Sequence, residues 1–284
     1  MIPAMSQAPE HDRLLDRSLH SGERPLPWGV NYLRHLVNYR FLMPFVAGRR
    51  VLDVGCGSGY GAALLGQGAA EVTGVDLSEE SVRYAKAHFA SGNVSFQHVA
   101  GGELLAHFPE GSFTAVTCIM VIEHIPRVER FVEAVARLLP PGGLFCVATN
   151  NREVLSPKDL GFHFHERELT PAETTELLAP YFERLEFYGL FENDRIQKAE
   201  EVTTRGKALF TRVTQADLLK LRRLIPQKLR KTMGQGINRF IHRRVAPLGA
   251  EVAPDEIQES DFSLRAESYS QALHFLCIAR RKGA

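Results

Sequence analysis

Residues 51–64 read VLDVGCGSGYGAAL, in which an apolar run meets Asp53 and glycines then occupy every second position up to residue 61. Glycine lets the backbone turn sharply and lets a ligand approach where a Cβ would block it. A turn of this kind between a strand and a helix brings free backbone N–H groups towards a bound ligand. The stretch therefore predicts a strand, a ligand-binding loop and a helix in succession.

Apolar strand patterns alternate with helical patterns on both sides of this loop. Strands are predicted at 50–56, 71–78, 94–100, 113–121, 144–150, 184–191 and 271–281, and helices at 31–45, 59–69, 79–90, 128–139 and 169–182. Ser78 is the expected N-cap of one helix. Thr170, Pro171 and Glu173 form the expected capping box of another. Repeated alternation predicts an α/β fold with a mostly parallel sheet and helices on both faces.

Two carboxylates accompany the glycines, and their positions constrain the ligand. Asp53 directly precedes the glycines, where it would repel a pyrophosphate but suit a cationic head group. Asp76 ends the second strand, where a carboxylate can accept both hydroxyls of a ribose. Each acid alone could be a solvated loop or capping residue, but together with the loop they point to S-adenosylmethionine. The degenerate G-x-G-x-x-G match from Gly57 to Ala62 keeps a nicotinamide dinucleotide dehydrogenase as an alternative.

The chain resembles the class I S-adenosylmethionine-dependent methyltransferases, specifically a bacterial small-molecule and glycan subgroup. The resembling segments are VLDVGCGSGYG, VTGVDLS, GSFTAVTCIMVIEHIP and LLPPGGLFCVATNN, together with HLVNYRFLMPFVAGRRVLD. The resemblance implies a Rossmann-like sheet of seven strands, the last antiparallel and inserted beside the sixth, and S-adenosyl-L-methionine as cofactor. It also implies these cofactor-binding residues: Asp53, Gly55, Cys56, Gly57, Tyr60, Asp76, Leu77, Gly102, Glu103, Met120, Tyr39 and His35. For the last two an alternative is open, in which Tyr39 is a core residue and His35 a partly exposed residue of its helix. One departure is that many relatives carry Gly-Asp where this chain has Gly102-Glu103.

The resemblance also suggests where an acceptor would be methylated. The fourth strand ends at Glu123 and His124, so His124 is a candidate base that Glu123 orients, although the pair could equally be structural. His165 lies in GFHFHERELTP, a segment that matches a second feature of the subgroup, and it could face the acceptor. Arg167 and Glu168 of the same segment are expected in a local salt bridge. No third ligand accompanies His163 and His165, so no metal is predicted.

We expect three parts along the chain: an N-terminal arm at 1–30, a methyltransferase core at 31–191 and 267–284, and a helical insertion at 192–266. The insertion is rich in lysine and arginine. It could be a lid or dimer element, a surface for an anionic acceptor, or, least favoured, a nucleic-acid surface.

Composition adds few constraints on function. The formal net charge of +1 gives no indication of nucleic-acid or membrane partners. Cys56, Cys118, Cys146 and Cys277 are expected to be buried and reduced, and no segment predicts a membrane span, so we expect a cytoplasmic protein. The expected function is O-methylation of a hydroxyl on a sugar, glycan or secondary metabolite, with a homodimer possible. A non-catalytic S-adenosylmethionine-binding partner protein is a further alternative.

Overall fold

The computed structural model describes residues 30–155, 167–197 and 257–283. Its strands are β1 (Arg50–Val54), β2 (Glu71–Asp76), β3 (Val94–His98), β4 (Ala115–Ile119), β5 (Leu144–Asn150), β6 (Phe182–Glu192), β7 (Phe262–Arg265) and β8 (His274–Arg281). Its α-helices are α2 (Val30–Val46), α3 (Tyr60–Leu65), α4 (Glu79–Phe89), α5 (Leu104–His107), α6 (Val128–Leu138) and α7 (Pro171–Leu178). Short 3₁₀ helices are η2 (Ile122–His124), η6 (Glu259–Asp261) and η7 (Tyr269–Gln271).

The strands form one sheet in the order β3-β2-β1-β4-β5-β8-β6-β7. The first five strands pair in parallel, whereas β8 runs antiparallel to both β5 and β6. The predicted α/β fold, with its antiparallel last strand beside the sixth in sequence, is confirmed. The sheet has eight strands rather than seven. The extra strand, β7, lies at the end of the segment that the sequence predicted to be helical.

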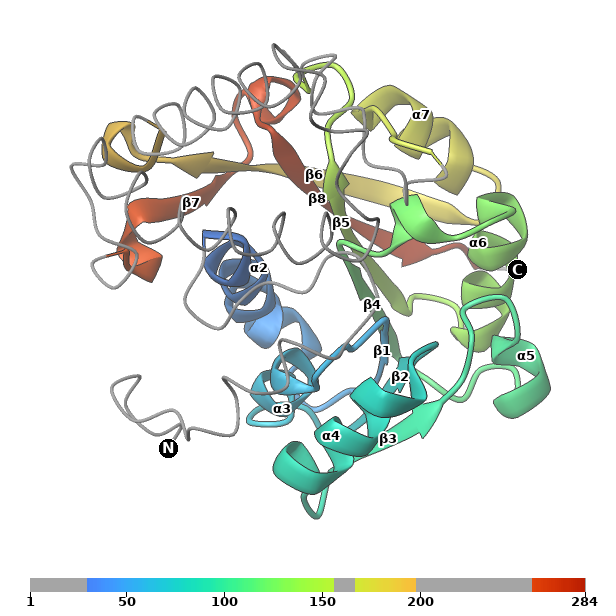
Figure 1. Cartoon of the computed structure of the whole chain (residues 1–284). Helices are drawn as coiled ribbons and strands as arrows, with labels where there is room; N and C mark the ends of the chain where they lie inside the picture. Colours follow the sequence, from blue (N-terminus) through green and yellow to red (C-terminus); the bar gives the residue numbers. More distant parts are fainter. Residues whose placement is uncertain (1–29, 156–166, 198–256, 284) are drawn as a thin grey trace, which may run out of the picture. The chain divides into compact units, whose positions relative to one another are not determined.

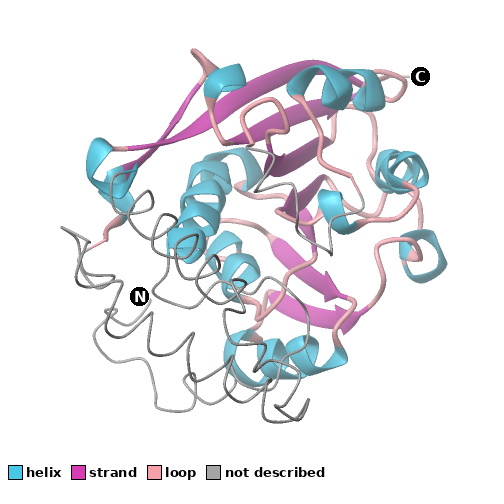
Figure 2. Ribbon diagram, turned by 45° about the horizontal axis from the view of Figure 1, so that its top comes forward, coloured by secondary structure: helices cyan, strands magenta, loops and turns pink. Residues whose placement is uncertain are grey.

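Helices cover both faces of the sheet (Figure 1): α2, α3 and α4 lie on one face, and α5, α6 and α7 on the other. Figure 2 shows the same layering, with helices on either side of the strands. The strands β4 and β5 are buried along their whole length, as strands covered on both faces should be. This burial explains why their sequences are nearly continuous apolar runs.

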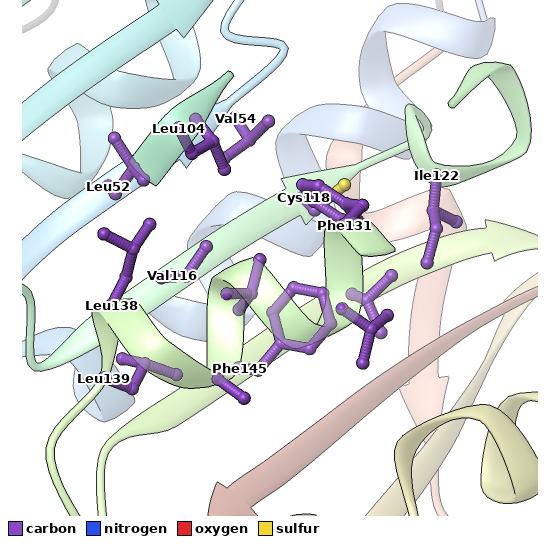
Figure 3. Packing of buried hydrophobic residues seen from close by; sticks show 14 of the residues in the cluster. Leu52, Val54, Leu104, Val116, Cys118, Ile122, Phe131, Leu138, Leu139 and Phe145 are labelled. Carbon is purple, nitrogen blue, oxygen red and sulfur yellow. The ribbon is translucent and has the colours of Figure 1, made fainter. Parts of the chain in front are cut away.

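The main hydrophobic core lies between the sheet and the α5–α7 layer. Leu52 of β1 and Val116 of β4 belong to it, together with Phe131 and Leu138 of α6 (Figure 3). All four cysteines are buried and free, as predicted. Full burial of a leucine or phenylalanine side chain in this core stabilises the fold by about 2 to 3 kcal/mol.

Local signals placed the helix starts correctly. The Ser78 hydroxyl accepts a hydrogen bond from the Ser81 N–H at the start of α4. At the start of α7, Thr170 and Glu173 exchange the two hydrogen bonds of a capping box, with Pro171 in the first turn. Each cap provides partners for N–H groups that the helix itself cannot satisfy.

The chain reverses its direction of travel across the sheet between β1 and β4. From β1 it proceeds outward to β2 and β3, and it then returns to place β4 on the other side of β1. Open α/β sheets bind ligands at the carboxyl ends of the strands beside such a switch point. The glycine loop that follows β1 lies at this position.

By its internal contacts the chain divides into one unit of residues 1–191 and 263–284 and a second of residues 192–262. Most of the basic segment that the sequence analysis singled out falls outside the described residues. Its expected helices and the arm at 1–30 therefore stay predictions. Within the described ranges, no helix is long and apolar enough to cross a membrane.

Candidate cofactor and acceptor site

The loop after β1 needs glycine for conformational reasons at three positions. Gly55, Gly57 and Gly59 have φ angles of 74°, 54° and 92°, a region that side chains with a Cβ rarely adopt. The N–H groups of Gly55 and Cys56 both donate to the Val75 carbonyl on β2, at 2.8 and 3.0 Å. These bonds pin the loop against the neighbouring strand.

The same glycines differ in the space around them. A Cβ on Gly55 would lie 2.3 Å from a Val121 methyl, and one on Gly59 would lie 2.7 Å from the Ala85 Cβ. A Cβ on Gly57 would meet nothing within 4 Å. Gly55 and Gly59 therefore allow close packing, whereas Gly57 leaves open space beside the backbone.

Asp53, the acid at the end of β1, is fully buried. Its Oδ1 accepts a hydrogen bond from the Thr117 hydroxyl at 2.6 Å, and the Tyr39 hydroxyl lies 3.2 Å from both of its carboxylate oxygens. Burial raises the pKa of Asp53 to about 7, although these hydrogen bonds oppose the rise, and the charge of Asp76 adds to it. The structure therefore holds a carboxylate whose ionisation near neutral pH would be favoured by a nearby cation.

Asp76, at the end of β2, is bound to the glycine loop. Its Oδ2 accepts from the Gly57 N–H and its Oδ1 from the Ser78 N–H, both at 2.8 Å. The next residue, Leu77, is 74% exposed. The Nε2 of His98 on β3 lies 2.8 Å from the Leu77 carbonyl oxygen and is within hydrogen-bonding distance. An oriented carboxylate thus lies next to an uncovered apolar side chain.

The aromatic residues predicted at the site gather over the loop. Tyr60 opens α3, and its ring lies 4.9 Å from Tyr32 and 6.0 Å from Tyr39 on α2. His35 lies one helical turn before Tyr39. Burial and the Arg34 charge lower the pKa of His35 to about 4. The helix α2 therefore brings Tyr39 into contact with Asp53, and His35 lies one turn earlier on the same helix.

The remaining predicted cofactor residues follow β3 and β4. Gly102 is exposed with open space around it, and Glu103 is the N-cap residue of α5 without a side-chain cap bond. Met120, just past β4, has a φ of 56° and donates its N–H to Ala148 on β5 at 2.8 Å. A left-handed backbone at a non-glycine residue is uncommon and occurs often at functional sites.

Comparison with known proteins places this geometry in a family. Residues 52–147 match a family model described as "Methyltransferase domain". The matched segment is therefore similar to a methyltransferase domain. S-adenosylmethionine is the cofactor of that family. The matched residues cover the loop, both acids and β1 to β5.

Curated relatives agree with this assignment. A protein of Mycolicibacterium smegmatis named "Probable S-adenosylmethionine-dependent methyltransferase" is 40% identical over 164 residues, which is 56% of this chain and 62% of that protein. A ubiquinone biosynthesis O-methyltransferase of Psychrobacter cryohalolentis is 34% identical over 166 residues, or 52% of this chain and 64% of that protein. The chain thus spans less than two thirds of the length of these relatives.

A solved structure from Thermotoga maritima, described as a methyltransferase and possible histamine N-methyltransferase, has the same fold. Its TM-score is 0.55 at 15% sequence identity, covering 88% of this chain and 91% of that chain. At this identity the likeness concerns the architecture of the methyltransferase domain.

The residues of the domain suit its family's cofactor on structural grounds. Leu77 and Val154 are the large hydrophobic side chains that stand exposed within the described ranges, and Leu77 adjoins the Asp76 carboxylate. An apolar ring such as adenine could cover Leu77, and the open backbone at Gly57 leaves room nearby. The cationic amino-acid end would be stabilised by the Asp53 charge.

Of the three catalytic candidates, the structure describes Glu123 and His124 but not His165. Glu123 and His124 belong to η2, directly after β4. Glu123 is 1% exposed and its Oε2 accepts from the Thr149 hydroxyl at 3.0 Å, whereas His124 is partly exposed. His165 lies outside the described residues. Arg167 forms its ion pairs with Glu129 and Glu173, at 3.4 and 3.6 Å, and these are not the Glu168 pair that the sequence suggested.

Two residues of the site were not predicted from the sequence. Thr117 lies beside Asp53 in the β1–β4 register and supplies its shortest hydrogen bond. A threonine inside an otherwise apolar strand is the signal that could have identified it. His274 begins β8 at the same edge of the sheet, and its position depends on a strand that arrives late in the sequence.

Proposed function

We propose that this chain is an S-adenosylmethionine-dependent methyltransferase that methylates a hydroxyl group on a small molecule, such as a sugar, a glycan unit or a secondary metabolite. The observation that carries the proposal is one cluster at the carboxyl edge of the sheet. It combines the buried Asp53, the loop-bound Asp76 and the exposed Leu77. A ligand with a cationic end, a diol and an apolar ring would satisfy all three.

The roles of the chain's residues follow from their chemistry. The Asp76 oxygens that accept from Gly57 and Ser78 retain lone pairs for the ribose hydroxyls. Leu77, with Gly102 and Glu103 at the neighbouring strand end, would border the adenine. Asp53, which accepts a hydrogen bond from the Tyr39 hydroxyl, would balance the charge of the amino-acid end.

When bound, S-adenosylmethionine supplies a methyl group on a positively charged sulfur, so the electrophile comes from the cofactor. The protein's work is then to align the acceptor and exclude water. His124, in the 3₁₀ helix η2 that follows β4, is our candidate to accept the hydroxyl proton, and the buried Glu123 carboxylate, which accepts a hydrogen bond from Thr149, would position it. His165, which lies outside the described residues, is a second candidate.

Hydroxyl acceptors are supported by relatives named ubiquinone biosynthesis O-methyltransferase. That name describes those proteins, and the acceptor of this chain is our proposal. We also propose the arm at 1–30, the core at 31–191 and 267–284, and an insertion at 192–266 that shapes the acceptor pocket or a homodimer. A cytoplasmic location belongs to the same proposal.

The proposal is tested by calorimetry and by methyl transfer. The full chain should bind S-adenosylhomocysteine and not NAD, and radiolabelled methyl groups should appear on hydroxyl compounds from a panel of catechols and sugars. His124→Ala should lower turnover and leave S-adenosylhomocysteine affinity within about twofold. Binding of NAD alone would favour the dehydrogenase reading. Binding of S-adenosylhomocysteine with no transfer to any acceptor would favour a non-catalytic partner protein.

A further inference from the structure

His274 occupies an unusual position in the sheet. It is the first residue of β8 and pairs with Asn150, the last residue of β5, and with Leu190 of β6. Because β8 runs antiparallel to β5, this start lies at the carboxyl edge of the parallel strands, the edge that also carries the glycine loop. Directly opposed residues share a face of the sheet, so the His274 and Asn150 side chains lie on the same face.

The His274 ring is buried without a hydrogen-bond partner. The residue is 8% exposed, and neither ring nitrogen has a partner within the described ranges. An unpaired buried polar group costs about 1 to 3 kcal/mol, so native proteins rarely keep one without a reason. A phenylalanine at this position would avoid that cost. The unpaired ring is therefore a candidate for contact with a ligand.

The helix α2 connects His274 to the cofactor site. Tyr39 of α2 contacts Asp53, and His35 lies one turn earlier, about 6 Å along the helix axis. Arg34 and His35 are close enough to His274 to act on its charge: burial lowers the His274 pKa well below its usual value, and both neighbours lower it further. Tyr39 and His35 thus connect the Asp53 end of α2 with the part of the helix whose charge acts on His274.

Arg34 is the permanent cation that acts on both imidazoles. Burial and Arg34 lower the pKa of His35, and the same influences with His35 lower that of His274. Asn150 and Leu190, which flank His274 on β5 and β6, carry no charge. A site with this bias disfavours an ammonium group and favours an oxyanion, which would accept hydrogen bonds from both rings and from the Arg34 guanidinium, one nitrogen of which already donates to the Asn31 side chain at 2.7 Å.

We propose that Arg34, His35 and His274 form a subsite for an anionic oxygen of the methyl acceptor, such as a carboxylate or an ionised phenol. This inference rests on the proposed function and specifies the acceptor class for the same site. The start of β8 lies at the carboxyl edge of the sheet, which also carries the glycine loop, so the subsite would hold the acceptor at the edge where the cofactor would bind. An entering anion would also draw a proton onto one or both rings below pH 6.5.

The test compares two catechols that differ only in charge, 3,4-dihydroxybenzoate and neutral 3,4-dihydroxybenzamide. Each is titrated at pH 6.0 into the full chain, with and without saturating S-adenosylhomocysteine. We expect the benzoate to bind about tenfold more tightly than the amide, with proton uptake revealed by buffers of different ionisation enthalpy. Catechol itself serves as a third probe that separates phenolate binding from carboxylate binding.

Variants connect this preference to the subsite. In His274→Gln the benzoate preference should fall below about threefold and proton uptake should decrease, whereas the exposed His107→Gln should behave as the wild type. His35→Gln provides a second variant if His274→Gln fails to fold. Equal affinities for benzoate and amide, no binding of either, or a preference retained in both variants would overturn the proposal. Failure to bind S-adenosylhomocysteine would instead count against the proposed function, because the probes are also tested without it.

Discussion

The substitution Asp53→Asn isolates the charge of the buried carboxylate. Asparagine keeps an oxygen for the Thr117 hydroxyl and an amide that can donate to Tyr39, so the hydrogen bonds can persist while the titration disappears. In the wild type the Asp53 pKa rises from its usual 3.8 to about 7 on folding. The folded chain therefore binds a proton more tightly than the unfolded chain does.

The sign of the effect follows from this proton linkage. A group whose pKa is raised by folding contributes stability at low pH, and the contribution is lost as pH rises through the folded pKa. Between pH 5 and pH 8 the wild type should lose about 2 to 3 kcal/mol of unfolding free energy from Asp53 alone. Asparagine does not titrate, so Asp53→Asn keeps its contribution at both pH values. The unfolding free energy of the variant, relative to that of the wild type, should therefore be about 2 to 3 kcal/mol higher at pH 8 than at pH 5.

Denaturant unfolding of both proteins without ligand, at pH 5 and pH 8, measures the difference directly. Other groups, including His35, titrate in both proteins and cancel in the comparison. Glu183→Gln, which removes an exposed acid on β6, is the control and should show no such change between the two pH values. A difference between Asp53→Asn and wild type that is the same at both pH values would refute the reasoning.

Three further substitutions test the site and the fold. Gly61→Ala should destabilise the chain by about 1 to 3 kcal/mol and weaken S-adenosylhomocysteine binding, because its Cβ would lie 2.2 Å from the Tyr39 ring. The matched control is Gly92→Ala, whose Cβ would meet nothing within 4 Å. Equal stability and equal affinity of the two variants would contradict the packing argument. Leu77→Asp should reduce S-adenosylhomocysteine affinity at least about tenfold with little change in melting temperature, since Leu77 is 74% exposed; unchanged affinity by calorimetry would remove Leu77 from the adenine site. Thr170→Ala should cost about 1 kcal/mol of unfolding free energy through loss of the α7 cap, and a change below about 0.3 kcal/mol would show that the capping box contributes little.

The elements with local signals could be predicted from the sequence. The glycine spacing located the loop after β1, and the caps at Ser78 and Thr170 located two helix starts. The apolar runs of β4 and β5 indicated strands buried on both faces. These signals succeed because each depends on residues a few positions apart.

What the sequence missed depends on long-range register. The strand β7 has four residues, too few for a clear period-two pattern, and follows a basic segment with helical spacing. Thr117 lies 64 positions from Asp53 in the sequence and donates a hydrogen bond to it. His274 pairs directly with Asn150 because β8 runs antiparallel to β5. The raised pKa of Asp53 likewise arises from burial of its carboxyl group in the folded chain, which the loop sequence does not encode.

The most direct test of the central claim is a calorimetric titration of S-adenosylhomocysteine into the wild type, Asp53→Asn and Asp76→Asn at pH 8. We predict that the wild type binds the ligand, that each substitution weakens binding at least about tenfold, and that NAD gives no heat of binding to any of the three. Equal binding of S-adenosylhomocysteine by all three proteins, or no binding to the wild type, would contradict the claim that the two carboxylates and the glycine loop form the cofactor site.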